Sequence, residues 1–478
     1  MLTGNAYGDT RPSYWPRVRQ FAVPPSMIET ATARRLVGDW AGACAAAGVD
    51  VDLNLRSVAR TWGHELAARL RADLRHLAPD LLRWHLPRIA PDGLLRPGLT
   101  IGLARYDTAG RDAHPVHLVA RTAPAWADAG QRLSLALWDG TLADAATRRH
   151  PHPHPDRRFR LDLHRHLWDA RRTDELRTRS GAGRPPAGAL PAPPPALLTR
   201  LPQGRRCAVD RWAAEAQLLL RADGRPTGSG PGPGPGAVTV RLGVRHRLLL
   251  DLVAASDGSA PPTPRITEAP PGDAASALPV LPDAATWVLP DLELIRTGAI
   301  EVDRLHPLVA SALVPDRPPT RPPRDPDGAA GPRSVECRGA LHRIGLVDGV
   351  LVPLDHDPAE IRREELLAEL TGTPLPCLQA IDEAHRHPDC LTGVRERLDH
   401  GDIAGALAVV EGLLGPDAVL RGGALRDALE RAAERRITYG LFRAGLTGPG
   451  PRPGLGGLRP DRSRTRDHRS RPRQATFR

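Results

Sequence analysis

The sequence contains no lysine, and all 66 of its basic residues are arginines. A chain without lysine cannot carry the lysine of a phosphate-binding P-loop, a Schiff-base amine, a Ser–Lys dyad or the ATP-binding lysine of a protein kinase. These enzyme classes are therefore excluded. The five cysteines are odd in number and scattered along the chain. They argue against a disulfide framework and favour reduced thiols in a cytoplasm.

Long hydrophobic runs are absent as well. No stretch reaches the roughly 18 apolar residues that a membrane helix needs. The first 20 residues also lack a basic segment followed by an apolar run, so no secretory signal is expected. We expect a cytoplasmic protein that does not enter a membrane.

Glycine and proline are abundant and together make up close to a fifth of the chain. Their densest runs cannot support a core and predict extended or flexible linkers. The expected organisation is an α+β module over 15–178, a linker over 179–204, a small mixed module over 205–314 with flexible tracts at 223–236 and 256–271, a linker over 315–333, a hairpin-plus-helix module over 334–446 and a disordered tail over 447–478.

The first module begins with helical patterning and then changes period. Over 58–77 apolar residues recur at helical spacing, among them Leu66, Leu70 and Leu74. Beyond Pro97 the apolar residues alternate, and segments 99–106, 116–122 and 132–138 are predicted strands, with a fourth at 159–164. Helices followed by short, closely spaced strands are typical of an α+β fold with an antiparallel sheet.

The second module has weaker patterning. Segment 209–220 is a predicted helix, and segments 237–242 and 248–254 are predicted strands.

The third module opens with a predicted β-hairpin. Asp348-Gly349 is a favoured two-residue turn and places Val347 opposite Val350. Pro353 cannot donate a hydrogen bond to a ladder, so its strand is expected at a sheet edge. Helices are predicted to follow over 360–370, 376–385, 391–398, 403–414 and 425–442.

Two segments of the chain resemble each other over about eight residues: Gly38–Ala45 and Gly401–Ala408. In each, a glycine ends one helix and an aspartate caps the next. Each segment resembles a helical hairpin of the tetratricopeptide type. There is no tandem register near 34 residues, so no solenoid is predicted. Chance similarity of alanine-rich helices after a Gly-Asp turn is the alternative.

Four residues of the third module are candidate zinc ligands: Cys337, His342, His387 and Cys390. They form two local pairs, but neither is the paired C-x₂₋₄-C arrangement that zinc sites favour. The alternative is that the cysteines are buried structural residues and the histidines lie on the surface. His342 also faces Asp355 across the hairpin, which makes it a candidate general base. A surface charge pair accounts for the same pattern.

Histidines are also concentrated between residues 150 and 166. His150, His152 and His154 alternate with prolines, and two more histidines follow at 164 and 166. Histidines two apart on an extended chain project to one side, close enough to share a soft metal ion. An exposed site would lack a second shell, so a solvated loop is the main alternative.

The C-terminal tail carries most of the net charge of +11. Residues 451–478 hold nine arginines and two aspartates, which leaves +4 for the other 450 residues. Arginine binds phosphate bidentately, so such an arm adds salt-sensitive affinity for RNA or DNA; an acidic protein surface, or solvent alone, would serve equally. The candidate contact residues are Arg459, Arg462, Arg464, Arg466, Arg469, Arg471 and Arg473.

In composition, and in segments such as GDWAGACAAAG and LVDGVLVPLDHDPAEIRREELL, the chain resembles uncharacterised, linker-rich proteins of high-GC bacteria. The resemblance implies no particular activity. We expect a non-enzymatic scaffold or accessory protein without a cofactor, which binds a protein partner through its C-terminal helical module and basic tail. Two alternatives stay open. One is a nucleic-acid- or ribosome-associated protein that uses the tail, and the other is a metal-dependent enzyme with a Cys/His site in 334–390.

Overall fold

The computed structural model describes residues 14–108, 114–127, 131–141, 150–183, 206–226, 236–243, 246–253, 263–269, 277–316, 333–337, 339–347, 350–353, 355–357, 359–363, 393–414 and 424–446, with single positions 366, 376 and 378. Helices and small, mainly antiparallel sheets occupy separate segments of this part of the chain. The predicted α+β class is confirmed.

Six helices open the fold: α1 (Trp15–Phe21), α2 (Pro25–Leu36), α3 (Trp40–Ala46), α4 (Leu55–Trp62), α5 (His64–His76) and α6 (Pro79–His85). The sequence predicts one helix over 58–77, but the structure breaks it at Gly63. The φ angle of Gly63 is +91°, a region that favours glycine. The predicted buried stripe is confirmed, since Leu66, Leu70 and Leu74 are each at most 4% exposed.

The two Gly-Asp segments adopt the same conformation. In each, the glycine has a positive φ and the aspartate caps the following helix. Asp39 accepts a hydrogen bond from the Gly42 amide (2.8 Å), and Asp402 accepts one from the Gly405 amide (2.9 Å). The carboxylates lie so close to Gly42 and Gly405 that a Cβ atom on either glycine would overlap the carboxylate. The predicted caps are confirmed.

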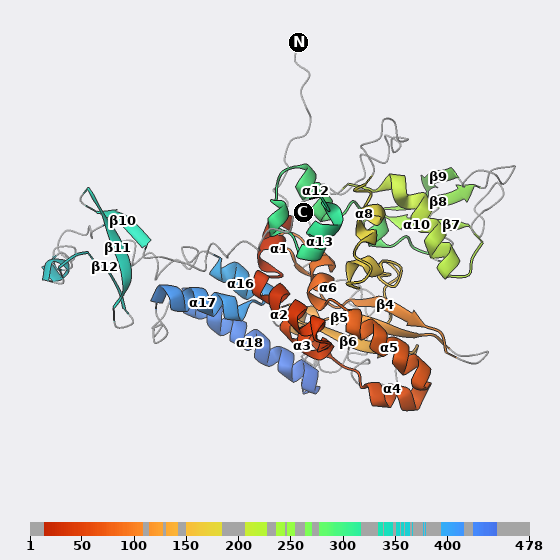
Figure 1. Ribbon diagram of the computed structural model, residues 1–478, viewed down its shortest axis with the longest axis horizontal. Helices are drawn as coiled ribbons and strands as arrows, with labels where there is room; N and C mark the ends of the chain where they lie inside the picture. The colour runs from red at the N-terminus through yellow and green to blue at the C-terminus, as the bar shows by residue number, and fades with distance from the viewer. Residues whose placement is uncertain are drawn as a thin grey trace, which may run out of the picture.

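The first sheet has the strand order β1-β6-β5-β4 and packs beside α3, α5 and α6 (Figure 1). Strands β4 (Thr100–Tyr106), β5 (Val116–Thr122) and β6 (Leu133–Trp138) are antiparallel, as predicted. The fourth strand is β1 (Val49–Val51), which runs parallel to β6. The strand predicted over 159–164 is wrong, because only Arg160 makes an isolated bridge there, to Gly102.

A second sheet, β7-β8-β9, packs on α10 (Val209–Ala222). Strands β7 (Ala237–Arg241) and β8 (Arg247–Val253) and the helix match the sequence prediction. Strand β9 (Thr263–Glu268) lies inside the tract 256–271, where the sequence indicates a flexible segment. Its Pro264 is compatible with a strand because β9 lies at the sheet edge, where a missing donor costs no ladder bond. Four further helices are α8 (Glu175–Ser180), α11 (Asp283–Thr286), α12 (Pro290–Arg296) and α13 (Pro307–Leu313). Helix α11 packs into the core of the second sheet, whereas α8, α12 and α13 pack against the core of the first.

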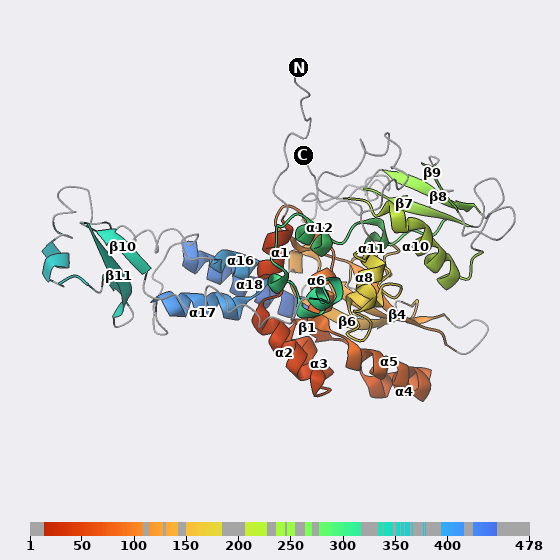
Figure 2. The same cartoon turned by 45° about the horizontal axis from the view of Figure 1, so that its top comes forward.

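The predicted hairpin forms one side of a three-stranded sheet, β10-β11-β12. Val347 pairs with Val350 and Pro353 lies on the edge strand β12 (Val350–Pro353), as expected. The sequence predicts a single first strand over 335–347, but the structure has two strands, β10 (Arg333–Cys337) and β11 (Ala340–Val347), with Gly339 at a φ of +82° between them. Both views place this sheet beyond the outer end of α17, away from the other sheets (Figures 1 and 2).

Three helices that pack on one another form the last described part of the chain: α16 (Val394–His400), α17 (Ile403–Leu414) and α18 (Ala424–Ala444). We call them the C-terminal helices. They match the predicted helical segments closely. The helices predicted over 360–370 and 376–385 fall mainly outside the described residues. The C-terminal helices contact the N-terminal part of the fold, with α16 beside α1 and α18 beside the turn at 125–127.

Candidate functional site

The structure places two of the four candidate zinc ligands. Cys337 on β10 is fully buried, and His342 on β11 lies opposite Val335. Since Cys337 and Val335 are two residues apart on one strand, Cys337 and His342 share a face of the sheet as diagonal neighbours. His387 and Cys390 lie outside the described residues. In the part of the chain that is described, no three Cys, His, Asp or Glu side chains are grouped to hold a metal.

The candidate general base His342 does not use Asp355. The Asp355 carboxylate accepts hydrogen bonds from the backbone amide of Arg343 (2.7 Å) and from its guanidinium (2.9 Å). These bonds lower the pKa of Asp355 to about 2. The His342 ring instead stacks on His356, with 4.1 Å between ring centroids. The prediction of an oriented His–Asp pair is therefore wrong, because an arginine one residue away takes the carboxylate.

The histidine-rich segment is only partly exposed. His150, His164 and His166 are at most 6% exposed, whereas His152 and His154 are exposed to solvent. The His150 ring lies 3.0 Å from the carbonyl of Thr122, and burial lowers its pKa to about 4. The sequence misses the burial of His150 because alternating prolines and histidines are typical of a linker, whereas the His150 ring lies against Thr100 and Thr122 of the first sheet.

One buried histidine–carboxylate pair has the composition of a catalytic dyad but not its geometry. Nε2 of His306 lies 3.0 Å from Asp80, and Nδ1 accepts a hydrogen bond from the Leu308 amide (3.2 Å). Both ring nitrogens are occupied, so neither can take a proton from a substrate. Nearby Cys44 has its pKa raised to about 12 by burial, which disfavours a thiolate nucleophile.

Helix α18 is attached to the first sheet by buried and half-buried polar groups. The Tyr439 hydroxyl donates to Asp50 (2.5 Å), which also pairs with Arg132 (2.6 Å). Arg443 forms a bidentate ion pair with Asp52. Burial alone would raise the pKa of Asp50, but the hydrogen bonds from Arg132 and Tyr439 outweigh burial and lower it. The contacts of Tyr439 and Arg443 join residues about 390 positions apart, which no local pattern in the sequence could indicate.

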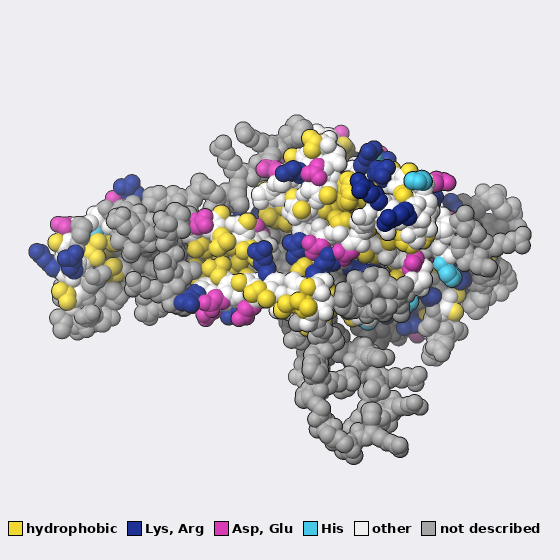
Figure 3. Space-filling view, turned by 90° about the horizontal axis from the view of Figure 1, so that it is seen from below, with side chains coloured by type: hydrophobic (Ala, Val, Ile, Leu, Met, Phe, Trp, Pro, Cys, Tyr) yellow, Lys and Arg dark blue, Asp and Glu magenta, His cyan; other side chains and the backbone are white. Residues whose placement is uncertain are grey.

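The C-terminal helices expose apolar side chains on their outer face. Leu407 is 40% exposed, Ile437 64%, Leu441 36% and Leu446 73%. Figure 3 shows hydrophobic side chains gathered over these helices, with acidic and basic side chains along their edge. The inner face of α18 is buried through Leu425, Ala428 and Ala432. We call the exposed set Leu407, Ile437, Leu441 and Leu446 the outer apolar face. The sequence predicted these helices but not which side they leave open.

The remaining predicted contact residues, the arginines between 459 and 473, lie outside the described part of the chain. In that described part, no helix combines the length and apolar content needed to cross a membrane. Comparison of the chain with models of protein families, with curated proteins and with solved structures found no match. Function is therefore inferred from the residues themselves.

Proposed function

We propose that this chain is a non-enzymatic binding protein that docks a partner protein on its outer apolar face. The observation that carries this proposal is Ile437, a large apolar residue that is 64% exposed on the uncovered side of α18. Leu441 follows one helical turn later on the same side of α18. Leu446 is exposed just beyond the C-terminal end of the helix. Contiguous exposed apolar groups of this kind mark protein interaction sites.

The charge beside this stripe indicates the partner's surface. Arg431 and Arg436 are exposed on α18 and make no hydrogen bond or close ion pair with any described residue. Each therefore keeps its donors for a partner, and arginine pairs bidentately with carboxylates. Small residues on the same side, Ala433 and Gly440, allow a second helix to approach closely. The expected partner presents an apolar surface flanked by acidic residues.

The test is a low-salt, nuclease-treated capture experiment with four matched baits, followed by identification of bound protein. The baits are the full chain, a version that ends at Gly450, Ile437→Glu, and the control Val37→Glu. Val37 is 78% exposed at the turn between α2 and α3, so it matches Ile437 in exposure but lies outside the outer apolar face. Because both sites are exposed, both variants should fold, which circular dichroism checks.

We expect the same protein to be retained by the full chain, the Gly450 version and Val37→Glu, and lost from Ile437→Glu. With the purified partner, Ile437→Glu should weaken binding at least tenfold. Retention by Ile437→Glu would overturn the proposal. The capture is repeated without nuclease treatment. If only the full chain then retains nucleic acid, the arginine tail rather than the outer apolar face is the functional element.

A further inference from the structure

A second site lies away from the outer apolar face, in a cleft of about 150 Å³ between α1, the segment after α6, and helices α10 to α12. About 10–15 Å³ measured in this way holds one water molecule, so the cleft has room for a ligand of about ten to fifteen non-hydrogen atoms. Its walls include the side chains of Trp15, Phe159 and Trp287. Seven arginines line it, and Asp283 is the only acidic side chain among the described residues that do so.

Four of these arginines are neutralised by carboxylates. Asp283 forms a bidentate ion pair with Arg158 (2.8 and 3.1 Å). The other three are Arg19, which pairs with Asp291 at 2.7 Å, Arg179, which pairs with Glu215 at 2.7 Å, and Arg160, which pairs with Asp162 at 2.8 Å and Asp223 at 3.0 Å.

Three arginines, Arg88, Arg96 and Arg211, have no such compensation. The guanidinium of Arg88 donates only to the carbonyls of Arg83 and Gly93, and that of Arg211 donates to two carbonyls. The guanidinium of Arg96 makes no hydrogen bond or ion pair with the residues that the structure describes, and Arg96 is exposed to solvent. Burial and then Arg83 lower the pKa of Arg88. Burial lowers the pKa of Arg211, and the nearby charges of Glu215 and Asp210 oppose this effect without forming an ion pair with it. Positive charge without ion-pair partners therefore gathers in the cleft.

The polar atoms of the cleft also lack partners. Nε of Arg88 and Nε of Arg211 are buried donors without an acceptor among the described residues. Nδ1 of His85 lies 3.2 Å from two backbone carbonyl oxygens, so it carries the hydrogen and leaves Nε2 as an acceptor. Burial lowers the pKa of His85 to about 4, which keeps the ring neutral, and Nε2 has no donor within the described chain. Buried polar atoms without partners require water or a ligand.

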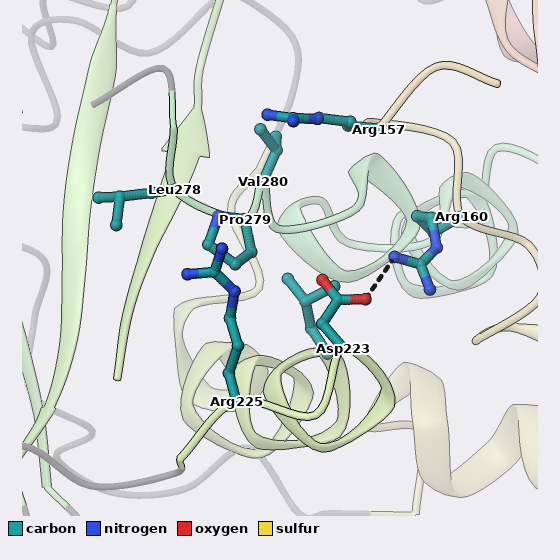
Figure 4. Close-up of a pocket in the computed structure, with 8 residues that line it drawn as sticks. Arg157, Arg160, Asp223, Arg225, Leu278, Pro279 and Val280 are labelled. Atoms are coloured by element: carbon teal, nitrogen blue, oxygen red, sulfur yellow. Dashed lines mark hydrogen bonds and ion pairs between the residues drawn. The ribbon is translucent and has the colours of Figure 1, made fainter. Parts of the chain in front are cut away.

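A hollow of about 120 Å³ adjoins the cleft across Arg160. Arg157 and Arg225 flank it, and the Arg160–Asp223 ion pair closes one side (Figure 4). Positive side chains at the approach to a cleft raise the local concentration of anions.

We propose that the cleft binds a small phosphate ester that carries hydroxyl groups, such as a sugar phosphate. The phosphate accepts hydrogen bonds from the guanidinium groups of Arg88, Arg96 and Arg211, and a hydroxyl donates to Nε2 of His85. A phosphate dianion supplies the negative charge and the acceptors that these arginines lack. A sugar ring supplies both the hydroxyl donor and apolar C–H groups for the aromatic wall.

Isothermal titration calorimetry on the full chain tests this proposal with four probes: ribose 5-phosphate, ribose, inorganic phosphate and malate. The main variant is Arg96→Gln, because its side chain makes no bond on which the fold depends. The control is Arg60→Gln, an exposed arginine on α4. A second variant, Arg211→Gln, is checked for an unchanged melting temperature.

Ribose 5-phosphate should bind, and the other three probes should bind at least tenfold more weakly. Arg96→Gln should weaken ribose 5-phosphate about tenfold, and Arg60→Gln should leave its affinity unchanged. Equal binding of malate or inorganic phosphate would overturn the assignment of a phosphate ester. An unchanged affinity in both Arg96→Gln and Arg211→Gln would overturn the site.

Discussion

The guanidinium of Arg83 donates a hydrogen bond of 2.9 Å to the backbone carbonyl of His400, 317 residues further along the chain. The same group donates to the carbonyls of Ala22 (2.9 Å) and Gln131 (2.5 Å). Ala22 and His400 lie at the C-terminal ends of α1 and α16, where helix carbonyls are unpaired and partially negative. One side chain, 2% exposed, therefore joins the N-terminal helices, the segment that leads into β6 and the C-terminal helices.

Replacing this arginine should destabilise the whole fold. In Arg83→Met three buried carbonyls lose their donor, and we expect the free energy of unfolding to fall by about 3–5 kcal/mol. Urea denaturation followed by circular dichroism measures the loss, with the exposed Arg71→Met on α5 as control. A loss below about 1 kcal/mol would show that the three segments are held together without Arg83.

Two helical glycines, one beneath an aspartate cap and one on an open helix face, should respond in opposite ways to substitution by alanine. In Gly42→Ala the new Cβ overlaps the Asp39 carboxylate, so the cap must move and stability should fall by about 1 kcal/mol. Gly440 is also helical, but its Cβ would meet nothing within 4 Å. Gly440→Ala should therefore raise stability by about 0.5–1 kcal/mol. Thermal denaturation measures both effects. Melting temperatures that shift in the same direction in the two variants would contradict this explanation.

Stability should fall as the protein is acidified from about pH 6.5 to about pH 4. Burial lowers the pKa of His85, His150 and His400 to about 4, whereas an unfolded chain protonates histidine near 6.5. In this window the unfolded state binds more protons, so the free energy of unfolding decreases with falling pH. For His150 and His400, which are at most 6% exposed, the maximum loss is about 3 kcal/mol each.

Urea unfolding at pH 7, 6 and 5 checks the direction of this effect. His400→Gln should flatten the profile, and His64→Gln, at an exposed histidine on α5, should not. A profile that rises towards pH 5 would contradict the burial of neutral histidines.

The zinc hypothesis predicts a defined metal content. If His387 and Cys390 complete the pair formed by Cys337 and His342, protein purified without a His tag carries about one zinc per chain. Cys337→Ser should then remove the metal, while Cys207→Ser should leave it in place. Elemental analysis without near-stoichiometric zinc would reject the site.

The features that the sequence predicts well are those encoded by neighbouring residues. The register of the Asp348-Gly349 hairpin, the extent of α17 and the caps at Asp39 and Asp402 each depend on fewer than about ten consecutive residues. Strand β1 is only three residues long, and Pro264 obscures β9. Neither has a periodic pattern long enough to detect.

The candidate sites have a different origin. The three cleft arginines that form no ion pair come from β2 (Arg88–Ile89), the residue after β3 (Leu94–Leu95) and α10. Their charge matters because no carboxylate pairs with them. The outer apolar face depends on which side of α18 remains uncovered. The sequence gives the number of arginines and leucines. Which arginines form ion pairs and which leucines stay exposed depends on contacts between distant segments.

The attachment of α18 to Asp50 and Asp52 has a consequence for synthesis of the chain on the ribosome. At about 5–20 residues per second, His400 emerges about 15–60 seconds after Arg83, and Tyr439 and Arg443 emerge later still. During that interval Asp50 and Asp52, the acidic edge of β1, lack their contacts with α18, and the Arg83 guanidinium lacks the His400 carbonyl. The N-terminal half therefore reaches its native energy only when translation is nearly finished, and a nascent chain stopped before α16 presents this edge to chaperones.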